Sequence, residues 1–372
     1  MGKLRTLYAI LILLYLSFTL ILKNNLFDFL VKNKIREETK NVSWVQKYGI
    51  PVLCYHHVIS DMNEAKSLFH LQKSKFKEQI KWLKENGFST ISLEDFSKYL
   101  NNEPVLLPEK PVLITFDDGR KNFFRNARDI LNEVDYKAVL FVYPGPIEKG
   151  HSYFLSWSEL ELLKNEGHEI QSHAYSHPNL SKLSAAEQNA EIMTSKEIIE
   201  KKLNIKVNWL AYPFGVYNHT TVNELKKENF KGAFTVFTSG NFAGEEKYSL
   251  KRTLILRDMS INDLAHKIMT VRLPLDNPTP SAGSVVVNEQ TIRLNLPKQL
   301  IKENMRVEMG SDFVNSNQQI SFSYNENTGL MQVDIKRITK RYLVITVSYN
   351  DGIGTYMQNS IMYNYGGWIP LS

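Results

Sequence analysis

The chain has 372 residues, with 45 Lys and Arg against 39 Asp and Glu, and 43% of it is hydrophobic. This length allows one large domain, a smaller second domain and a terminal segment, and the net charge of +6 favours an anionic neighbourhood such as phospholipid headgroups or cell-wall polymers. No compact basic motif suggests binding to nucleic acid. The single cysteine, Cys54, excludes an internal disulfide, which favours a Gram-positive surface over a disulfide-forming periplasm for an exported protein.

The N-terminus contains a candidate membrane anchor. After Lys3 and Arg5, residues 6–22 form a run of 17 residues without charge, near the lower limit for crossing a bilayer. No Ala-x-Ala cleavage signal follows, so we predict an uncleaved signal anchor over residues 1–24 rather than a removed signal peptide. Residues 25–48 are then a charged spacer. The protein is expected as a single-pass cell-membrane protein with its main domain on the extracellular face, and cleavage of the anchor would make it secreted.

Short apolar runs alternate with helical stretches through residues 49–272. The runs are Val52–Tyr55, Ser89–Ile91, Val112–Thr115, Ala138–Val142, His168–Gln171, Asn208–Ala211, Gly232–Val236 and Thr253–Leu256. The helical stretches include Lys73–Asn86, Leu93–Leu100, Lys121–Glu133, Ser158–Glu166, Ala185–Lys201 and Thr220–Glu228. Such alternation predicts a parallel α/β domain, and its number of units predicts a barrel of seven or eight strands. Ser158 and Glu161 have the spacing of a capping box, next to which Trp157 would be a hydrophobic staple.

Residues suited to a metal site follow two of these runs. Asp117 and Asp118 come directly after an apolar strand, and His173 and His177 follow about fifty residues later. A catalytic zinc-type ion takes three protein ligands from histidine and carboxylate, a set that Asp118, His173 and His177 supply. Asp117 is then free to act as a general base. In a barrel the strand ends share one face, so these residues are expected to converge there. The ligand set suits zinc, but also cobalt, nickel or iron.

Three sequence blocks resemble the first three motifs of the polysaccharide deacetylase family, which is carbohydrate esterase family four or the NodB-homology domain. They are Thr-Phe-Asp-Asp-Gly at 115–119, Ser-His-Ala-Tyr-Ser-His-Pro at 172–178 and Tyr-Pro-Phe-Gly at 212–215. The resemblance implies a distorted (β/α) barrel that removes acetyl groups from N-acetylglucosamine units of a polymer. By this match Asp117 is the general base, while Asp118, His173 and His177 bind one divalent metal ion.

The third block departs from the family pattern. The family usually has an arginine ahead of the proline, which orients the general base, whereas this chain reads Leu210-Ala211-Tyr212-Pro213. Arg252 and Arg257 flank the last predicted strand and are candidates to orient Asp117. The alternative for each is an ordinary solvent-facing charge at a strand end.

The general acid has two candidates. The family takes this histidine from a late Leu-x-His motif, which here matches only Leu264-Ala265-His266 inside a helical stretch. Residues 54–58, Cys-Tyr-His-His-Val, instead resemble the start of the intercellular-adhesin type deacetylases of poly-β-1,6-N-acetylglucosamine. In that subgroup the acid comes from this early position and the third motif has Tyr-Pro in place of the arginine. Both departures therefore favour His56 as the acid, with His57 structural.

The resemblance implies metal-assisted hydrolysis of an acetamide, with the oxyanion held by the ion and by the backbone N–H of Tyr212. Aromatic side chains near the strand ends are candidates to contact the sugar ring or the acetyl methyl group. Core packing is the alternative for each of them. The substrate-binding candidates are Tyr212, Pro213, Phe214, Tyr175, Trp157 and Phe116.

A change in composition predicts a second domain. Prolines at 274, 278 and 280, together with Ser281 and Gly283, indicate a linker over residues 273–283. Apolar runs separated by turns over residues 284–372 then predict a small all-β domain, sandwich-like in form. Aromatic residues near its end fit either a β core or a glycan-binding accessory surface: Tyr349, Tyr356, Tyr363, Tyr365 and Trp368.

The predicted function is metal-dependent N-deacetylation of an extracellular polysaccharide. Poly-β-1,6-N-acetylglucosamine of biofilm is the first candidate substrate, and N-acetylglucosamine of peptidoglycan or chitin-type oligomers is the second. A weakly active or inactive glycan-binding or assembly protein is the remaining alternative. The combination of a base with an acid favours an enzyme, because a binding module needs neither.

Overall fold

The computed structural model describes residues 43–60, 63, 67–311, 314–315, 320–336, 342–350 and 356–365. The predicted anchor at 1–24 and the predicted spacer as far as residue 42 lie outside the described residues. In the described part of the chain, no helix is both long and apolar enough to cross a membrane. The chain divides into two compact units, Met1–Lys47 and Tyr48–Ser372, and the short helix α2 (Trp44–Tyr48) lies at their boundary.

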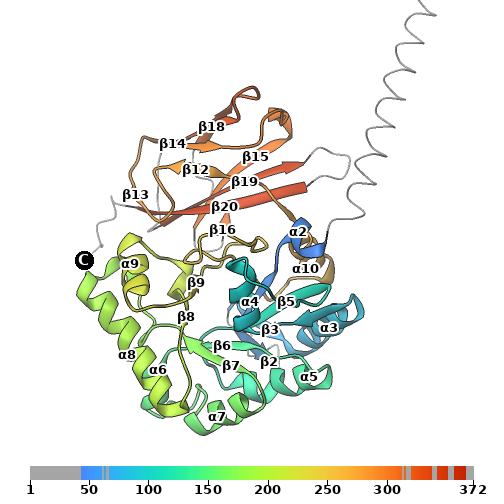
Figure 1. Cartoon of the computed structure of the whole chain (residues 1–372), viewed down its shortest axis with the longest axis vertical. Helices are drawn as coiled ribbons and strands as arrows, with labels where there is room; N and C mark the ends of the chain where they lie inside the picture. Colours follow the sequence, from blue (N-terminus) through green and yellow to red (C-terminus); the bar gives the residue numbers. More distant parts are fainter. Residues whose placement is uncertain are drawn as a thin grey trace, which may run out of the picture. The chain divides into compact units, whose positions relative to one another are not determined.

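A parallel sheet of eight strands forms the centre of the N-terminal part of the second unit (Figure 1). The strand order is β10-β1-β5-β6-β7-β8-β9, and β4 pairs with the first half of β5. In chain order the strands are β1 (Val52–Tyr55), β4 (Phe88–Thr90), β5 (Lys110–Phe116), β6 (Val139–Val142), β7 (Glu169–Ser172), β8 (Trp209–Ala211), β9 (Gly232–Phe234) and β10 (Thr253–Leu254). Each coincides with one of the apolar runs of the sequence, so the predicted parallel α/β domain is confirmed.

The sheet is a half-barrel, which is more open than the predicted barrel. Within the described residues no ladder joins β9 to β10, and Phe234 and Leu250 form only an isolated bridge. A closed barrel of this type has a helix after each strand. Residues 235–252 contain no helix, and β9 and β10 have only three and two residues. The seam between these two strands therefore stays open.

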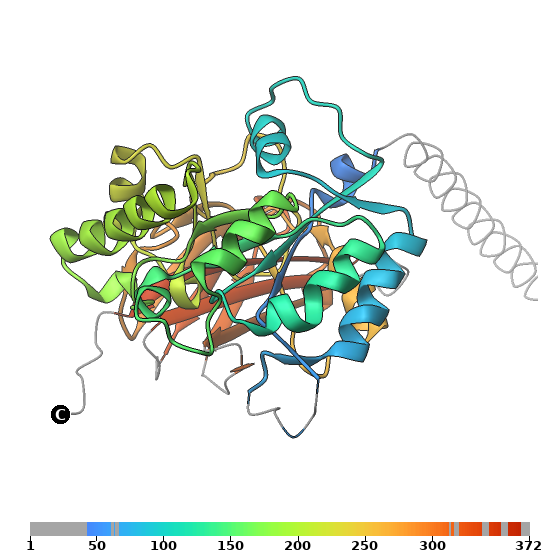
Figure 2. The ribbon, with the colours of Figure 1, turned by 90° about the horizontal axis from the view of Figure 1, so that it is seen from below.

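Amphipathic helices accompany the strands (Figures 1 and 2). In α3 (Lys73–Glu85) the buried residues Phe76, Ile80 and Leu83 follow the spacing of one helix face. The other helices are α4 (Leu93–Leu100), α5 (Arg128–Glu133), α6 (Pro144–Glu148), α7 (Trp157–Asn165), α8 (Ala185–Leu203), α9 (His219–Lys227) and α10 (Ile261–Ile268). A π-helix, η2 (Phe123–Ala127), leads into α5, and the short helix α6 was not predicted.

The capping box of α7 lies two residues earlier than predicted. Ser156 accepts a hydrogen bond from the N–H of Glu159, and the Glu159 carboxylate accepts one from the N–H of Ser156. Ser158 and Glu161 therefore lie inside the helix, and Trp157 is its first residue rather than a staple. The prediction was wrong because both serines have a glutamate three residues later, so spacing alone does not separate them.

The C-terminal part is rich in strands, which form two β-sheets that contribute to one buried cluster. The six-stranded sheet consists of β11 (Val271–Arg272), β13 (Val285–Val286), β15 (Met305–Ser311), β16 (Val314–Asn315), β19 (Tyr342–Asn350) and β20 (Tyr356–Tyr365). The four-stranded sheet consists of β12 (Asp276–Thr279), β14 (Gln290–Asn295), β17 (Ile320–Tyr324) and β18 (Leu330–Ile335). Ile292, Val333 and Ile345 belong to the buried cluster that both sheets contribute to.

Two expectations about this region need correction. The predicted linker at 273–283 contains strand β12, and its residues Leu273 and Leu275 are buried in the hydrophobic cluster. The linker is thus an integral part of the β domain. Of the aromatic residues considered for glycan binding, Tyr349 and Tyr363 are buried in the core. The side chains of the other three lie outside the described part.

Candidate active site

The three predicted metal ligands converge beyond the carboxyl ends of two strands. Asp118 follows β5, and His173 and His177 follow β7. Oδ1 of Asp118 lies 3.9 Å from Nε2 of His173 and 3.7 Å from Nε2 of His177. These separations are slightly less than twice the bond length of ~2.0–2.2 Å between zinc and a nitrogen or oxygen ligand. One divalent ion therefore fits between the three side chains.

Uncommon backbone conformations carry these ligands. Asp118 and His177 have φ angles of 74° and 63°. A left-handed conformation costs a residue other than glycine about 1–3 kcal/mol, and such strain is concentrated at functional sites. Gly119, with φ of 65°, lies so close to the next strand that a Cβ atom would be 2.9 Å from Cγ1 of Val142. The Asp-Asp-Gly turn is therefore fixed by its packing as well as by its own conformation.

Both histidines are in the form that binds metal. The carbonyl oxygen of Ala211 lies 2.6 Å from Nδ1 of His173, so Nδ1 carries the proton and the lone pair of Nε2 faces Asp118. Burial lowers the pKa of His173 to about 4, although the nearby carboxylates act in the opposite direction. Burial lowers the pKa of His177 as well. Neutral imidazoles at neutral pH, next to one ionised carboxylate, are a donor set that fits zinc.

Arg252 holds the predicted general base in place. Its Nη1 and Nη2 each donate a hydrogen bond of 2.7 Å to one carboxylate oxygen of Asp117, and the two side chains are 0% and 3% exposed. Burial raises the pKa of Asp117, but Arg252 and His173 outweigh this effect and hold the pKa at about 2. Of the two arginines considered from the sequence, Arg252 reaches the carboxylate. Arg257 instead pairs with Asp258.

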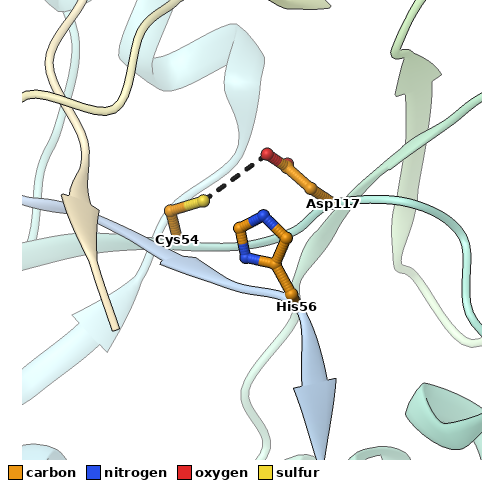
Figure 3. A group of neighbouring side chains, drawn as sticks. All are labelled: Cys54, His56 and Asp117. Carbon is orange, nitrogen blue, oxygen red and sulfur yellow. Dashed lines mark hydrogen bonds between the residues drawn. The ribbon is translucent and has the colours of Figure 1, made fainter. Parts of the chain in front are cut away.

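Cys54 and His56 also lie next to Asp117 (Figure 3). The thiol of Cys54 donates to Oδ2 of Asp117 at 3.5 Å. His56 stacks on Phe69 with ring centroids 4.8 Å apart, and its buried Nδ1 has no hydrogen-bond partner among the described residues. Burial lowers the pKa of His56, and the nearby carboxylates oppose this. The early histidine is therefore at the site, whereas His266 is exposed on α10.

Phe214 is the predicted aromatic residue that lies against the metal ligands. Its ring is 4.7 Å from the ring of His177 and is 47% exposed. Phe214 has a φ angle of 61°, and it is presented by the short turn η4 (Pro213–Gly215), which begins at the predicted Pro213. Tyr175 is half-buried, and its backbone N–H donates to Glu191. The exposed ring of Phe214 thus offers an apolar surface directly beside the site.

Three residues do not have the roles predicted for them. The backbone N–H of Tyr212 donates to the carbonyl oxygen of Phe234 at 3.0 Å, so it is not available to hold an oxyanion. Trp157 donates through Nε1 to Glu148 at 2.7 Å, and the ammonium group of Lys202 lies over its ring. None of the described contacts of Trp157 involves a residue of the site. Phe116 is 2% exposed and packs in the core.

Two further residues, which were not predicted at the site, lie against Asp118. Nε2 of His57 and Nε of Arg120 each lie 3.6 Å from Oδ2 of Asp118. Arg120 also donates to the hydroxyl of Tyr143, whose ring is 5.1 Å from that of His177. Burial raises the pKa of Asp118, but the adjacent His57 and the other histidines of the site outweigh this effect and keep the pKa well below its usual range. In the sequence His57 is next to His56, and Arg120 directly follows the Asp-Asp-Gly turn. These positions could have indicated that both residues lie at the site.

The chain is similar to known proteins in sequence and in fold. The sequence pattern of the family described as polysaccharide deacetylase matches residues 106–233. A solved structure, the Streptococcus pyogenes deacetylase PplD in complex with acetate, is 32% identical, with a TM-score of 0.56, and the match covers 60% of this chain and 99% of that one.

Two curated proteins are similar over much of their length. The putative polysaccharide deacetylase YxkH of Bacillus subtilis is 26% identical over 228 residues, which are 60% of this chain and 79% of that protein. The poly-beta-1,6-N-acetyl-D-glucosamine N-deacetylase of Staphylococcus aureus is 26% identical over 276 residues, which are 68% of this chain and 94% of that protein.

Proposed function

The chain belongs to the polysaccharide deacetylase family and is a hydrolase that cleaves an amide bond, and we propose that its substrate is extracellular poly-β-1,6-N-acetylglucosamine. The observation that carries the proposal is the Asp117–Arg252 pair, placed beside three metal ligands and the early histidine His56. The absence of an arginine ahead of Pro213 and the early position of the acid favour this polymer over peptidoglycan or chitin oligomers. The similar protein of Staphylococcus aureus is named for this substrate, which supports the same choice.

Asp118, His173 and His177 are the proposed ligands of one divalent ion, for which zinc is the first choice. When bound, such an ion polarises the acetamide carbonyl and lowers the pKa of a water molecule. Asp117 accepts the proton of the attacking water. Its pKa of about 2 keeps the carboxylate ionised at neutral pH. The two hydrogen bonds from Arg252 fix its orientation, so no rearrangement is needed when the proton arrives.

His56 is the proposed general acid, which donates a proton to the nitrogen of the leaving sugar. Burial lowers the pKa of His56 and so makes its protonated form a stronger acid. Among the described residues no acceptor pairs with Nδ1 of His56, so none of them competes for a proton at that atom. The products are acetate and a free amino sugar. Phe214, half exposed beside His177, is the proposed contact for the sugar or the acetyl methyl group.

The proposed location is the outer face of a Gram-positive cell membrane, with residues 1–24 as the anchor. Support comes from the uncharged run at residues 6–22 and from the absence of a cleavage signal after it. The net charge of +6 fits a surface close to anionic lipids or wall polymers. The substrate lies outside the cell, which requires the same orientation.

Acetate release from defined polymers tests the proposed function. The purified chain is incubated with poly-β-1,6-N-acetylglucosamine, peptidoglycan and chitin oligomers, each with a chelator, without it, and with zinc restored after chelation. We expect acetate from the β-1,6-linked polymer, loss of this activity with the chelator and its recovery with zinc. If no polymer yields acetate with zinc, cobalt or nickel supplied, the protein is a glycan-binding member of the family instead.

A further inference from the structure

A basic hollow adjoins the proposed catalytic site. It has a volume of about 470 Å³, and its lining includes Arg120, Lys121 and Arg125 together with the stacked rings of His57 and His70. No aspartate or glutamate contributes to the described lining. The hollow meets the metal site directly, because His57 and Arg120 both belong to its wall and both lie 3.6 Å from Asp118.

The backbone that carries these cations is held by contacts between two segments. Arg120 and Phe154 form a β-bridge, and the N–H of Lys121 donates to the carbonyl oxygen of Tyr153 at 3.0 Å. The guanidinium of Arg120 lies over the ring of Phe154 at 4.2 Å. Arg125 is carried by the π-helix η2, a type of element that is rare and frequent at functional sites. The positions of the cations are therefore set by fixed structure rather than by a free loop.

Two buried polar atoms of the lining have no hydrogen-bond partner among the described residues. They are Nε of Arg120, a donor, and Oδ1 of Asn122, an acceptor. An unsatisfied buried polar group costs about 1–3 kcal/mol. Because Nε of Arg120 already lies 3.6 Å from Oδ2 of Asp118, the atom that calls for a partner is Oδ1 of Asn122. Oδ1 of Asn122 suits a hydroxyl group of a ligand, and the guanidinium of Arg125 on the same lining suits an anionic oxygen. A substituted sugar has both.

One of the three cations of the lining has no carboxylate partner among the described residues. Lys121 lies 3.6 Å from Glu159, and the partner of Arg120 is Asp118, which the proposed function also assigns to the metal ion. The guanidinium of Arg125 is exposed and has no carboxylate within ion-pair distance in the described part of the chain. Tyr153, 71% exposed on the same lining, offers a ring on which a sugar can stack.

We propose that this hollow binds an anionic substituent of the polysaccharide, a carboxylate or a phosphodiester, next to the N-acetylglucosamine unit that is deacetylated. The inference rests on the proposed function, because it places a sugar in the catalytic site. It predicts that the preferred polymer is an acidic derivative rather than neutral poly-β-1,6-N-acetylglucosamine. The same charges disfavour a free glucosamine in the hollow, since its ammonium group is repelled.

Matched substrates test this inference with the full chain. They are a β-1,6-linked N-acetylglucosamine pentamer, the same pentamer with O-succinyl groups, and the same pentamer with glycerol phosphate groups. The measured quantity is the ratio of kcat/KM for each acidic pentamer to kcat/KM for the neutral one. We expect a ratio above one for the wild type, and a fall of about two- to fivefold in Arg125→Gln, the loss typical of one exposed ion pair.

Arg306→Gln is the matched control, because Arg306 is 78% exposed on β15 in the C-terminal sheet. It should leave the ratio unchanged. A ratio of one in the wild type, or an equal ratio in Arg125→Gln, would overturn the inference. A high ratio for the succinylated pentamer alone identifies a carboxylate as the ligand, and a high ratio for the phosphorylated pentamer alone identifies a phosphodiester.

Binding measured without catalysis separates this inference from the proposed function. Fluorescence anisotropy of the labelled succinylated pentamer with the inactive double variant Asp117→Asn and Arg252→Met, in which no buried charge is left unpaired, should show binding that weakens as salt is raised, because added ions screen exposed charges. Arg125→Gln in the same background should bind more weakly. If the wild type releases no acetate from any pentamer but this binding is seen, the proposed function fails and the basic hollow stands. Salt-independent binding would contradict the role of the hollow.

Discussion

Replacement of Arg252 by methionine is the sharpest test of the catalytic arrangement. The change removes two hydrogen bonds of 2.7 Å from a carboxylate that is 3% exposed and leaves that charge buried without its partner. Loss of one member of a buried ion pair destabilises a protein by about 3–5 kcal/mol. Burial is then less opposed, so the pKa of Asp117 rises. Because the base also loses its fixed orientation, we expect acetate release to fall by about a hundredfold or more.

A second substitution separates catalysis from folding. In the variant with both Asp117→Asn and Arg252→Met neither charge remains, and the removal of both members of a buried pair is often close to neutral for stability. Thermal unfolding should therefore show that the double variant recovers most of the stability lost in Arg252→Met, while acetate release stays absent. Arg252→Lys should give intermediate activity, because a single ammonium group does not bridge both carboxylate oxygens. Full activity in Arg252→Met, or a double variant no more stable than the single one, would refute this reasoning.

Three other predictions concern single residues. Asp118→Asn should lose both the bound metal and acetate release. Asp117→Asn should keep the metal and lose activity by a factor of about 10²–10⁴, the usual contribution of a general base. Elemental analysis of the dialysed variants measures the metal, and equal metal loss in both would contradict their different roles. Phe214→Ala should raise KM severalfold without lowering the unfolding temperature, because the ring is 47% exposed; a change in kcat alone would argue against a sugar contact. Burial lowers the pKa of His168 to about 4, so the unfolded chain binds a proton at this residue at a higher pH than the folded chain does. The folded state should therefore lose up to about 3 kcal/mol of stability as the pH falls from 6.5 to 4. Denaturant titrations should show a smaller loss over this range in His168→Gln.

Much of the catalytic fold was predictable because its strands are buried on both faces. Runs such as Val52–Tyr55 and Val139–Val142 are apolar throughout, and all their residues are buried in the structure. The closure of the barrel was not predictable in the same way. Closure depends on whether residues 235–252 form a helix and on strand pairs only two or three residues long. The periodicity of apolar residues does not predict features that short. Helix α6 was missed because its Pro144-Gly145-Pro146 start resembles a turn, although proline is favoured in the first helical turn.

The site was predictable where a residue follows a strand directly and less so where a contact depends on the backbone around it. The two adjacent carboxylates and the histidine pair could be assigned from their positions after strands. The role given to the N–H of Tyr212 was wrong, because sheet pairing with Phe234 already uses that donor. The approach of Arg120 to Asp118 depends on a turn at positive φ, which sequence spacing does not reveal.

Arg252 shows how a distant residue replaces a local motif. It lies 135 positions after Asp117 in the sequence, just ahead of β10. Strand β10 pairs with β1, and β1 pairs with β5, so only β1 separates the strand after the arginine from the strand before the aspartate. The guanidinium also donates to the carbonyl oxygen of Thr235 and lies near the ring of Phe141, 5.5 Å from its centroid.

The interior of the half-barrel is therefore filled by a charged side chain whose hydrogen bonds all point to fixed partners. A buried arginine in this position is tolerated only because the carboxylate of Asp117 compensates its charge. The stability of the sheet interior and the orientation of the base consequently depend on the same two hydrogen bonds. This coupling is why the double substitution at Asp117 and Arg252, rather than either single one, distinguishes a catalytic role of the pair from a purely structural one.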